Sequence, residues 1–142
     1  FIGENSNKYV DFSNKIGIDK SVITFVDQIP HKEIANKIKE SSLFILFSNY
    51  ENLPCVILEA FSCGVPVIST DVGGIKEYFP HNFGKLIEIN NRKELKAEII
   101  NFYKKKYLVA SKNKMHNYVK SIFSKKVIAQ NFTELYFKSL NL

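Results

Sequence analysis

Short apolar runs alternate with segments of helical periodicity along most of the chain. Leu43–Phe47 contains only apolar residues, which is typical of a strand buried on both faces of a parallel sheet. A β-branched run predicts a second strand at Val22–Val26, and further strands are predicted at Pro66–Thr70 and Gly84–Ile89. Phe1–Ile2 has the composition of a strand end. The pattern therefore predicts several short strands separated by helices.

The segments between these runs carry helix signals. Pro54 lies where a helix would begin and Gly64 where it would end, so a helix is predicted between them. Asn91 or Asn90 is predicted to cap a helix that ends near Tyr103. Further helices are predicted at Ser6–Ile16, Pro30–Ser41 and Ile75–Phe79, and after Ser124 in the lysine-rich C-terminal part.

This alternation at short spacing predicts one α/β domain over residues 1–142, built on a doubly wound, Rossmann-like parallel sheet. Residues 122–142 are predicted to form a C-terminal helix. In such sheets, ligands bind beyond the carboxyl ends of the strands. Two loops occupy that edge here: Ser48–Pro54 follows the apolar strand, and Asp71–Gly74 follows the next one.

The helix that begins at Pro54 predicts a phosphate site. Its first backbone N–H groups, those of Cys55, Val56 and Ile57, have no acceptor within the helix. The positive end of the helix dipole lies at the same place. Amides and dipole together favour binding of an anion.

Two glutamates, Glu51 and Glu59, flank this predicted site and are separated by seven residues. Glu59 is the only charged residue from Leu53 to Gly64 and lies one helical turn after Cys55. A carboxylate beside a phosphate is repelled unless it holds hydroxyl groups, and a ribose diol offers two. The residues alone leave alternatives open, namely a Glu59 bonded to a neighbouring loop and a Glu51 exposed as a loop acid.

Three motifs in this stretch resemble the C-terminal, donor-binding domain of retaining GT-B glycosyltransferases of family 4, the glycosyl transferases of group 1. Glu51 and Glu59 match the family's two glutamates at this spacing. Glu59–Val67 matches its EA-x-x-x-G-x-P-V segment, and Gly73–Glu77 matches its GG-x-x-E segment. Three elements in order are much more specific than the glutamate pair alone. Weaker similarity extends over about residues 1–121.

The resemblance implies that the domain binds a nucleotide diphosphate sugar. Family members hold the ribose with the second glutamate, here Glu59, and orient the donor sugar with the first, here Glu51. The diphosphate meets amides at the helix start, and glycine-containing loops approach the ligand. Besides Glu59, the resemblance assigns nucleotide binding to Leu53, Pro54, Cys55, Val56, Gly3, Gly73 and Gly74.

The implied reaction transfers the sugar to an acceptor hydroxyl with retention of the anomeric configuration, without a metal ion or a cofactor. The predicted setting is bacterial capsule or lipopolysaccharide synthesis, where acceptors are lipid-linked. Two other functions stay open: a GT-B-like nucleotide-sugar epimerase and a non-catalytic, flavodoxin-like binding module. A receiver-type module would need an acidic cluster, which Asp71 alone does not supply.

Two departures from the family limit the prediction. Asp27 replaces the glycine usually found after the third strand, which leaves the identity of the base open. The family's Arg and Lys that neutralise the diphosphate, and its N-terminal acceptor domain, have no counterpart in this sequence. We therefore expect a fragment that cannot catalyse transfer alone and binds donor weakly. The resemblance also implies that the helix in residues 122–142 contacts the N-terminal domain.

Charge is concentrated in the C-terminal part. Residues 101–142 carry nine lysines against one acid, Glu134, within a chain of net charge +6. A single arginine, Arg92, argues against nucleic-acid reading, where arginine is the commonest tool. The basic part fits a cytoplasmic protein with peripheral contact to the inner membrane. Cys55 and Cys63 are predicted to be small buried residues, too far apart for a disulfide.

Overall fold

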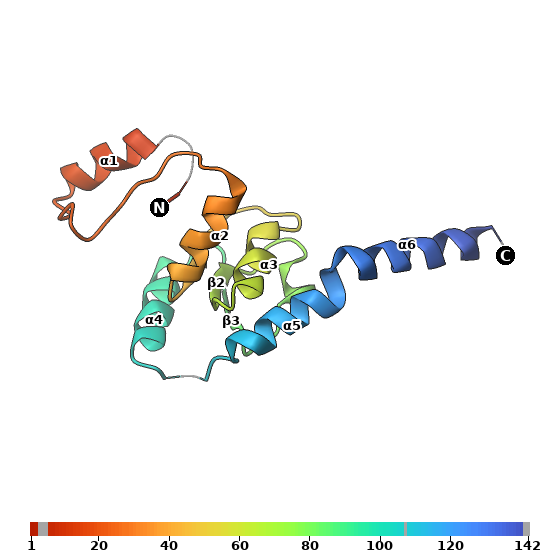
Figure 1. The fold of residues 1–142 in the computed structure, drawn as a ribbon. Coiled ribbons are helices and arrows are strands. Elements are labelled where there is room, and N and C mark those ends of the chain that lie inside the picture. Colours follow the sequence, from red (N-terminus) through yellow and green to blue (C-terminus); the bar gives the residue numbers. More distant parts are fainter. Residues whose placement is uncertain (3–5, 107, 141–142) are drawn as a thin grey trace. The chain divides into compact units, whose positions relative to one another are not determined.

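The computed structural model describes residues 1–2, 6–106 and 108–140, and the chain divides into two compact units (Figure 1). Unit 1 comprises Phe1–Asn36 and unit 2 comprises Lys37–Leu142. The helix α2 (His31–Glu40) begins in the first unit and ends in the second, close to the bounds predicted for it. Each unit is described by itself.

Unit 1 contains the helix α1 (Ser6–Lys15) and one isolated parallel bridge, between Ile2 and Val26. The Val26 N–H donates to the Phe1 carbonyl at 2.8 Å. The prediction of a full strand at Val22–Val26 was wrong: in this segment the described pairing is the single bridge at Val26. The predicted helix over Ser6–Ile16 is confirmed as α1.

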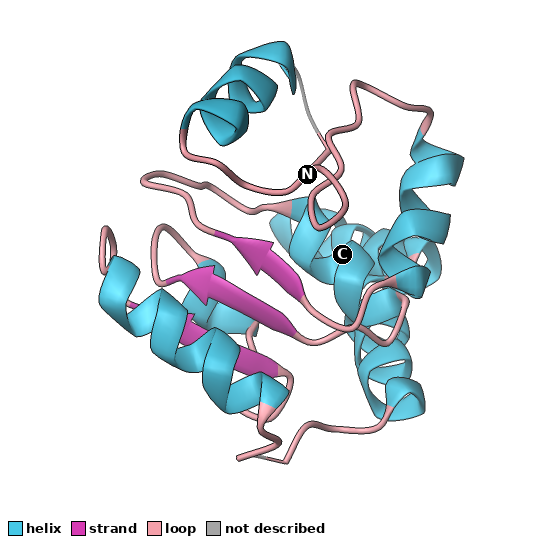
Figure 2. Cartoon of the chain, turned by 90° about the vertical axis from the view of Figure 1, so that its left-hand side faces the viewer, coloured by secondary structure: helices cyan, strands magenta, loops and turns pink. Residues whose placement is uncertain are grey.

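Unit 2 is built on a parallel sheet of three strands, β1 (Phe44–Leu46), β2 (Val67–Thr70) and β3 (Gly84–Ile87), in the order β1-β2-β3. Phe44 pairs with Val67, and Val67 pairs with Gly84, so the strand starts are in register. Figure 2 shows the three strands running in one direction between helices. The predicted α/β class with a parallel sheet is confirmed.

The burial of the strands differs from the sequence prediction in one place. All four residues of β2 are buried, as expected for a strand with a neighbour on each side. In β1, however, Ile45 is 42% exposed. The prediction that Leu43–Phe47 is buried on both faces was therefore wrong, because β1 is the edge strand of the sheet that unit 2 contains.

Helices cover both faces of the sheet. The helix α3 (Cys55–Ser62) packs on α5 (Lys112–Phe123) on one face, and α4 (Arg92–Tyr103) contacts β2 and β3 on the other (Figure 2). Gly64 ends α3 with a φ of +72°, as its placement predicted. Asn91 caps α4 by accepting from the Glu94 N–H at 3.0 Å.

The core of unit 2 lies between α3, α5 and the sheet. Phe61 and Phe83 are fully buried and meet edge to face with ring centroids 5.1 Å apart. Tyr118 extends this aromatic stack, 5.2 Å from Phe83. The stack fixes α5 against the sheet and so holds the strands whose ends carry the candidate site.

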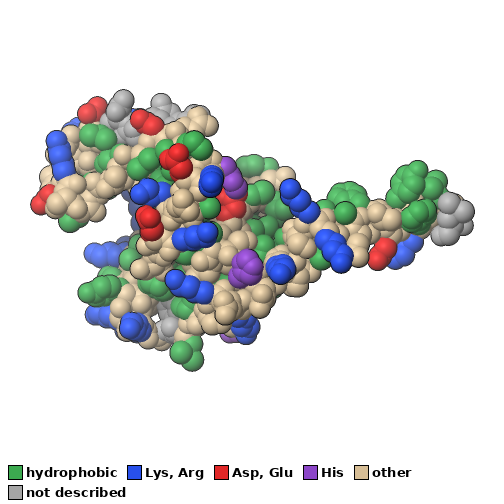
Figure 3. Space-filling view, in the orientation of Figure 1, with side chains coloured by type: hydrophobic (Ala, Val, Ile, Leu, Met, Phe, Trp, Pro, Cys, Tyr) green, Lys and Arg blue, Asp and Glu red, His purple; other side chains and the backbone are tan. Residues whose placement is uncertain are grey.

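The last helix, α6 (Lys125–Ser139), extends from α5 away from the sheet of unit 2 (Figure 1). Lysines and apolar side chains both lie along it (Figure 3). Its apolar residues do not fold back on the sheet, since Phe132 is 70% exposed and Leu135 is 64% exposed. Among the described helices, none is both long enough and apolar enough to cross a membrane.

Candidate functional site

The loops after β1 and β2 are joined at their first residues by a hydroxyl group. Thr70, the last residue of β2, is buried, and its Oγ1 donates to the Ser48 carbonyl at 2.6 Å. The same oxygen accepts from the Ser48 N–H at 3.1 Å. Thr70 therefore holds the end of β1 and the end of β2 together before either loop begins. Sequence reasoning missed this contact, because a threonine at a strand end is common.

The two loops also meet further out, where the predicted glycine pair lies. Gly73 has a φ of +58°, and a Cβ on it would overlap the carbonyl oxygen of Glu51. The Gly74 N–H donates to the Asn52 carbonyl at 3.4 Å. The structure thus brings Gly73 and Gly74 against the backbone of the residues around Glu51. A side chain at Gly73 would force the loops apart.

The helix α3 begins directly after this contact. Pro54 is its N-terminal cap and makes no side-chain cap hydrogen bond, and the first turn holds no acidic residue. The Ile57 N–H donates to the Pro54 carbonyl at 3.1 Å, so the prediction that it has no acceptor within the helix was wrong. The amides of Cys55 and Val56 remain the first-turn groups without an acceptor inside the helix. This helix start can receive an anion.

The two predicted glutamates lie on either side of this helix start. Glu51 is half-buried in the loop that Gly73 contacts, and Glu59 is half-buried one turn into α3. The charge of Glu59 reaches Cys63, at the end of the helix. Burial first raises the pKa of the Cys63 thiol; the nearby charge of Lys39 lowers it and that of Glu59 raises it. Glu51 thus precedes α3 and Glu59 lies within it; that the two carboxylates flank a ligand at the helix start stays a prediction.

Tyr78 is a residue of this region that the sequence did not single out. It lies in the 3-10 helix η1 (Ile75–Tyr78), directly after the glycine turn, and is only 7% exposed. Its hydroxyl is buried without a hydrogen-bond partner among the residues described. Burial first, and then the charges of Cys55, Glu51 and Tyr118, raise the pKa of Tyr78 to about 12. In sequence it resembles an ordinary core tyrosine.

Other predicted site residues have mixed outcomes. Gly3 lies outside the described residues. Leu53 is 49% exposed just before α3. Cys55 is exposed, so the prediction that both cysteines are buried was wrong. Cys55 is the first residue of α3, and its side chain faces away from the core. Cys63 is half-buried, and neither of these two cysteines forms a disulfide. In the described part of the chain, no cluster of His, Cys, Asp or Glu could hold a metal ion.

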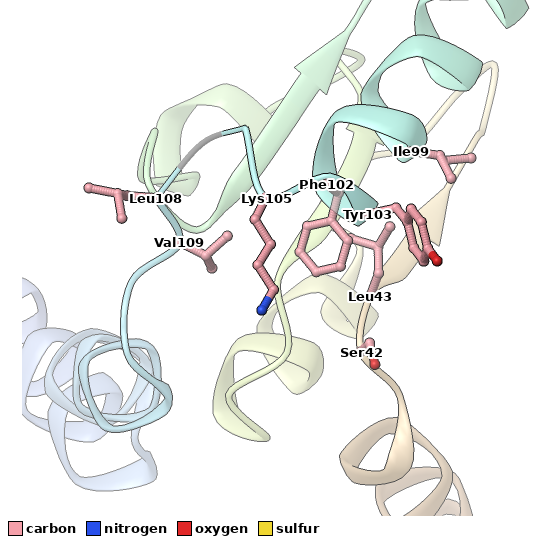
Figure 4. A pocket seen from close by; sticks show the side chains of 8 residues that line it. All are labelled: Ser42, Leu43, Ile99, Phe102, Tyr103, Lys105, Leu108 and Val109. Carbon is pink, nitrogen blue, oxygen red and sulfur yellow. The ribbon is translucent and has the colours of Figure 1, made fainter.

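A separate apolar cavity of about 760 Å³ lies at the other edge of the sheet, where β1 begins. Leu43, Phe102 and Tyr103 gather on one side of it in Figure 4, and Leu108 points away. Ser42 and Leu43 precede β1, whereas the Ser48–Pro54 loop follows it. The cavity is therefore not part of the site at the start of α3.

A comparison with protein families matches residues 1–122 to the model described as "Glycosyl transferases group 1". The chain belongs to this glycosyltransferase family. The resemblance of the three motifs is thereby confirmed.

Individual relatives of this glycosyltransferase domain are longer proteins. It is 29% identical over 115 residues to a subunit of the human phosphatidylinositol N-acetylglucosaminyltransferase, covering 80% of this chain but 24% of the relative. It is 36% identical over 70 residues to the lipopolysaccharide 1,6-galactosyltransferase of Salmonella typhimurium, covering 49% of this chain and 20% of the relative. The glycosyltransferase domain thus spans about a quarter or less of these two proteins.

Among solved structures, HepE of Anabaena, solved in complex with UDP, superposes with a TM-score of 0.81 at 22% identity. The match covers 96% of this chain and 40% of HepE. This likeness confirms the Rossmann-like fold of the glycosyltransferase domain, one half of the GT-B architecture. The roles of Glu51, Glu59 and the helix start stay predictions.

Proposed function

We propose that this chain binds the nucleotide diphosphate sugar of a retaining glycosyltransferase at the start of α3. One observation supports this most directly: the Glu51–Asn52 backbone packs on Gly73 and Gly74 immediately before a helix start without a side-chain cap. In a chain of the glycosyl transferases group 1 family, this arrangement supports an anion-binding point at the start of α3.

The diphosphate would be held by backbone groups at the helix start. The amides of Cys55 and Val56 point to the end of α3 that carries partial positive charge. Leu53 and Pro54 shape the approach of the chain to this point. The amides and the helix dipole would contribute to stabilising the phosphate charge.

The two glutamates would bind hydroxyl groups on either side of the diphosphate. Glu59 accepts from the ribose hydroxyls, and Glu51 accepts from hydroxyls of the donor sugar. This divides the ligand into a nucleoside side and a sugar side. Transfer to an acceptor hydroxyl, with retained anomeric configuration, would also need cationic groups beside the diphosphate and a site for the acceptor.

Cys55 provides a direct test because its thiol is exposed at the proposed phosphate position. Saturating UDP, GDP or ADP is expected to slow alkylation of Cys55 by N-ethylmaleimide by about tenfold, since a bound diphosphate covers the first turn of α3. Peptide mass spectrometry over a time course measures the modification of each cysteine separately.

Cys63 is the matched control in the same helix region, because it is half-buried at the opposite end of α3. Its alkylation rate should not change with nucleotide. Equal protection of both thiols would indicate general tightening of the fold, and unchanged rates at Cys55 with all three nucleotides would contradict the proposed site.

We also propose peripheral contact with the cytoplasmic face of an anionic membrane, in lipopolysaccharide or capsule assembly on lipid-linked acceptors. Residues 101–142 carry nine lysines and one acid, and Tyr103 and Leu108 are 84% and 93% exposed beside Lys104–Lys106. Lysines beside exposed aromatic and aliphatic side chains suit an anionic lipid surface.

Co-sedimentation with vesicles tests this contact. We expect binding to vesicles of phosphatidylglycerol and phosphatidylcholine, loss of binding to phosphatidylcholine alone, and several-fold weakening when Lys104, Lys105 and Lys106 are changed to glutamine. Binding that is equal for both vesicle types, or unaffected by the triple substitution, would argue against this surface.

A further inference from the structure

Tyr78 has a feature that donor binding as described above does not explain. Its side chain is 7% exposed, and its hydroxyl lacks a hydrogen-bond partner among the described residues. Folding removes this hydroxyl from water without replacing its hydrogen bond, so phenylalanine would be at least as stable there. An unsatisfied buried hydroxyl in a folded protein calls for a specific role.

The ring of Tyr78 is held in place from several sides. The Tyr118 hydroxyl donates to the Tyr78 carbonyl at 2.8 Å, which ties η1 to α5. The ring of Phe123 packs edge-on against the Tyr78 ring, with centroids 6.1 Å apart. The hydroxyl therefore has little freedom to turn toward another partner.

The groups whose charges act on this hydroxyl belong to the candidate site. The thiol of Cys55, at the start of α3, and the carboxylate of Glu51 both lie close enough to raise the pKa of Tyr78, beside the effect of burial and of Tyr118. Glu51 is not hydrogen-bonded to the hydroxyl in this structure. A phenol donor thus lies buried within electrostatic range of a carboxylate acceptor that it does not yet bind.

Two contacts fix the backbone of the Glu51 loop, and neither of them involves the Glu51 side chain. Gly73 packs on the Glu51 carbonyl, and Gly74 donates to the Asn52 carbonyl at 3.4 Å. The helix η1, which ends at Tyr78, follows these glycines directly. The two glycines therefore link the Glu51 loop to the segment that carries Tyr78. A rotation of the Glu51 side chain is enough to change its distance from the hydroxyl.

We propose that Tyr78 is a positioning residue for Glu51: when a donor sugar occupies the site, the Tyr78 hydroxyl donates to the Glu51 carboxylate and fixes it toward the sugar hydroxyls. This inference rests on the proposed function, in which Glu51 binds the sugar. The contact stabilises only the complex that contains the sugar. Nucleotide without sugar gains nothing from it.

The test compares a nucleotide with its sugar conjugate. UDP with UDP-N-acetylglucosamine, UDP with UDP-glucose, and GDP with GDP-mannose are titrated by ligand-observed NMR into the parent chain and into Tyr78→Phe. For the pair that binds the parent, we expect Tyr78→Phe to weaken the sugar nucleotide about tenfold, as for one hydrogen bond to a charged group, with nucleotide binding unchanged. The melting temperature should be unchanged or higher.

Glu51→Gln and the double variant separate positioning from packing. If Tyr78 acts through the Glu51 carboxylate, Tyr78→Phe adds no further loss in the Glu51→Gln background. Tyr136→Phe, in α6, is the remote control and should bind every ligand as the parent does. Glu51→Gln should also lower the pKa of Tyr78. Tyrosine 13C NMR measures this pKa without any ligand.

The outcomes distinguish this inference from the proposed function. Binding of the parent to none of the ligands would overturn both. Binding by the parent that Tyr78→Phe leaves unchanged, or weakens equally with and without sugar, would overturn the role of Tyr78 alone. A Tyr78 pKa that does not respond to Glu51→Gln would do the same.

Discussion

Glu59→Gln is expected to weaken nucleotide binding about 10-fold to 100-fold, because a hydrogen bond to a charged group is worth about 1.5–3 kcal/mol. Glutamine keeps the shape of the side chain but removes its charge and one acceptor, so the two ribose hydroxyls lose their common partner. Glu59 is half-buried within α3, which keeps water from replacing that partner fully. Calorimetric titration with UDP, GDP and ADP measures the loss.

The ligand itself supplies the sharpest control for this prediction. The parent should bind UDP more tightly than 2′-deoxy-UDP. Glu59→Gln should bind the two ligands alike, because the variant lacks the carboxylate that the 2′-hydroxyl would contact. Glu134→Gln in α6 serves as the matched charge control, since it lies outside the candidate site. A Glu59→Gln variant that retains the parent's preference for the 2′-hydroxyl would rule out the ribose role.

Gly73→Ala is expected to abolish measurable donor binding and to lower the free energy of unfolding by more than about 1–2 kcal/mol, the cost of a left-handed conformation for an L-residue. The added Cβ also overlaps the Glu51 carbonyl oxygen, so the two loops must separate. That separation moves Glu51 and the residues before α3 away from the phosphate position. Urea denaturation and nucleotide titration measure the two effects.

Gly74 is the matched control, one residue along the same turn. Its φ is −87°, and a Cβ there would lie 3.7 Å from the Asn52 carbonyl oxygen, which is ordinary contact. Gly74→Ala should therefore change stability by no more than about 0.4–1 kcal/mol, in the stabilising direction, through the unfolded chain. Equal damage from both substitutions would mean that the loops do not depend on the conformation of Gly73.

The helix ends of unit 2 follow from local signals that act within a few residues. Gly64 ends α3 and Asn91 caps α4. Each of these two roles depends only on the backbone within a few residues. The position of the candidate site followed from parallel strands ending at one edge. These features could be predicted because neither distant packing nor a missing partner can change them.

The features that the sequence did not predict depend on contacts between distant residues. Thr70 joins Ser48 across 22 positions in the chain, and no residue pattern marks that pair. Tyr78 lies near the start of α3 because α5 fixes it there through Tyr118. The exposure of Ile45 was not predicted, because the composition of a strand reports its apolar character but not whether the strand has a second neighbour.

The Thr70–Ser48 contact has a consequence for how this part of the molecule can vary. Both contacts that hold the segment after β1 are made to its backbone: Thr70 binds the Ser48 amide and carbonyl, and the Gly74 N–H donates to the Asn52 carbonyl. We therefore expect substitutions of the exposed side chains of Asn52 and Leu53 to have little effect on folding. Under the proposed function, a graft of this segment from a relative, with Glu51 and Thr70 kept, is expected to change which donor sugar binds.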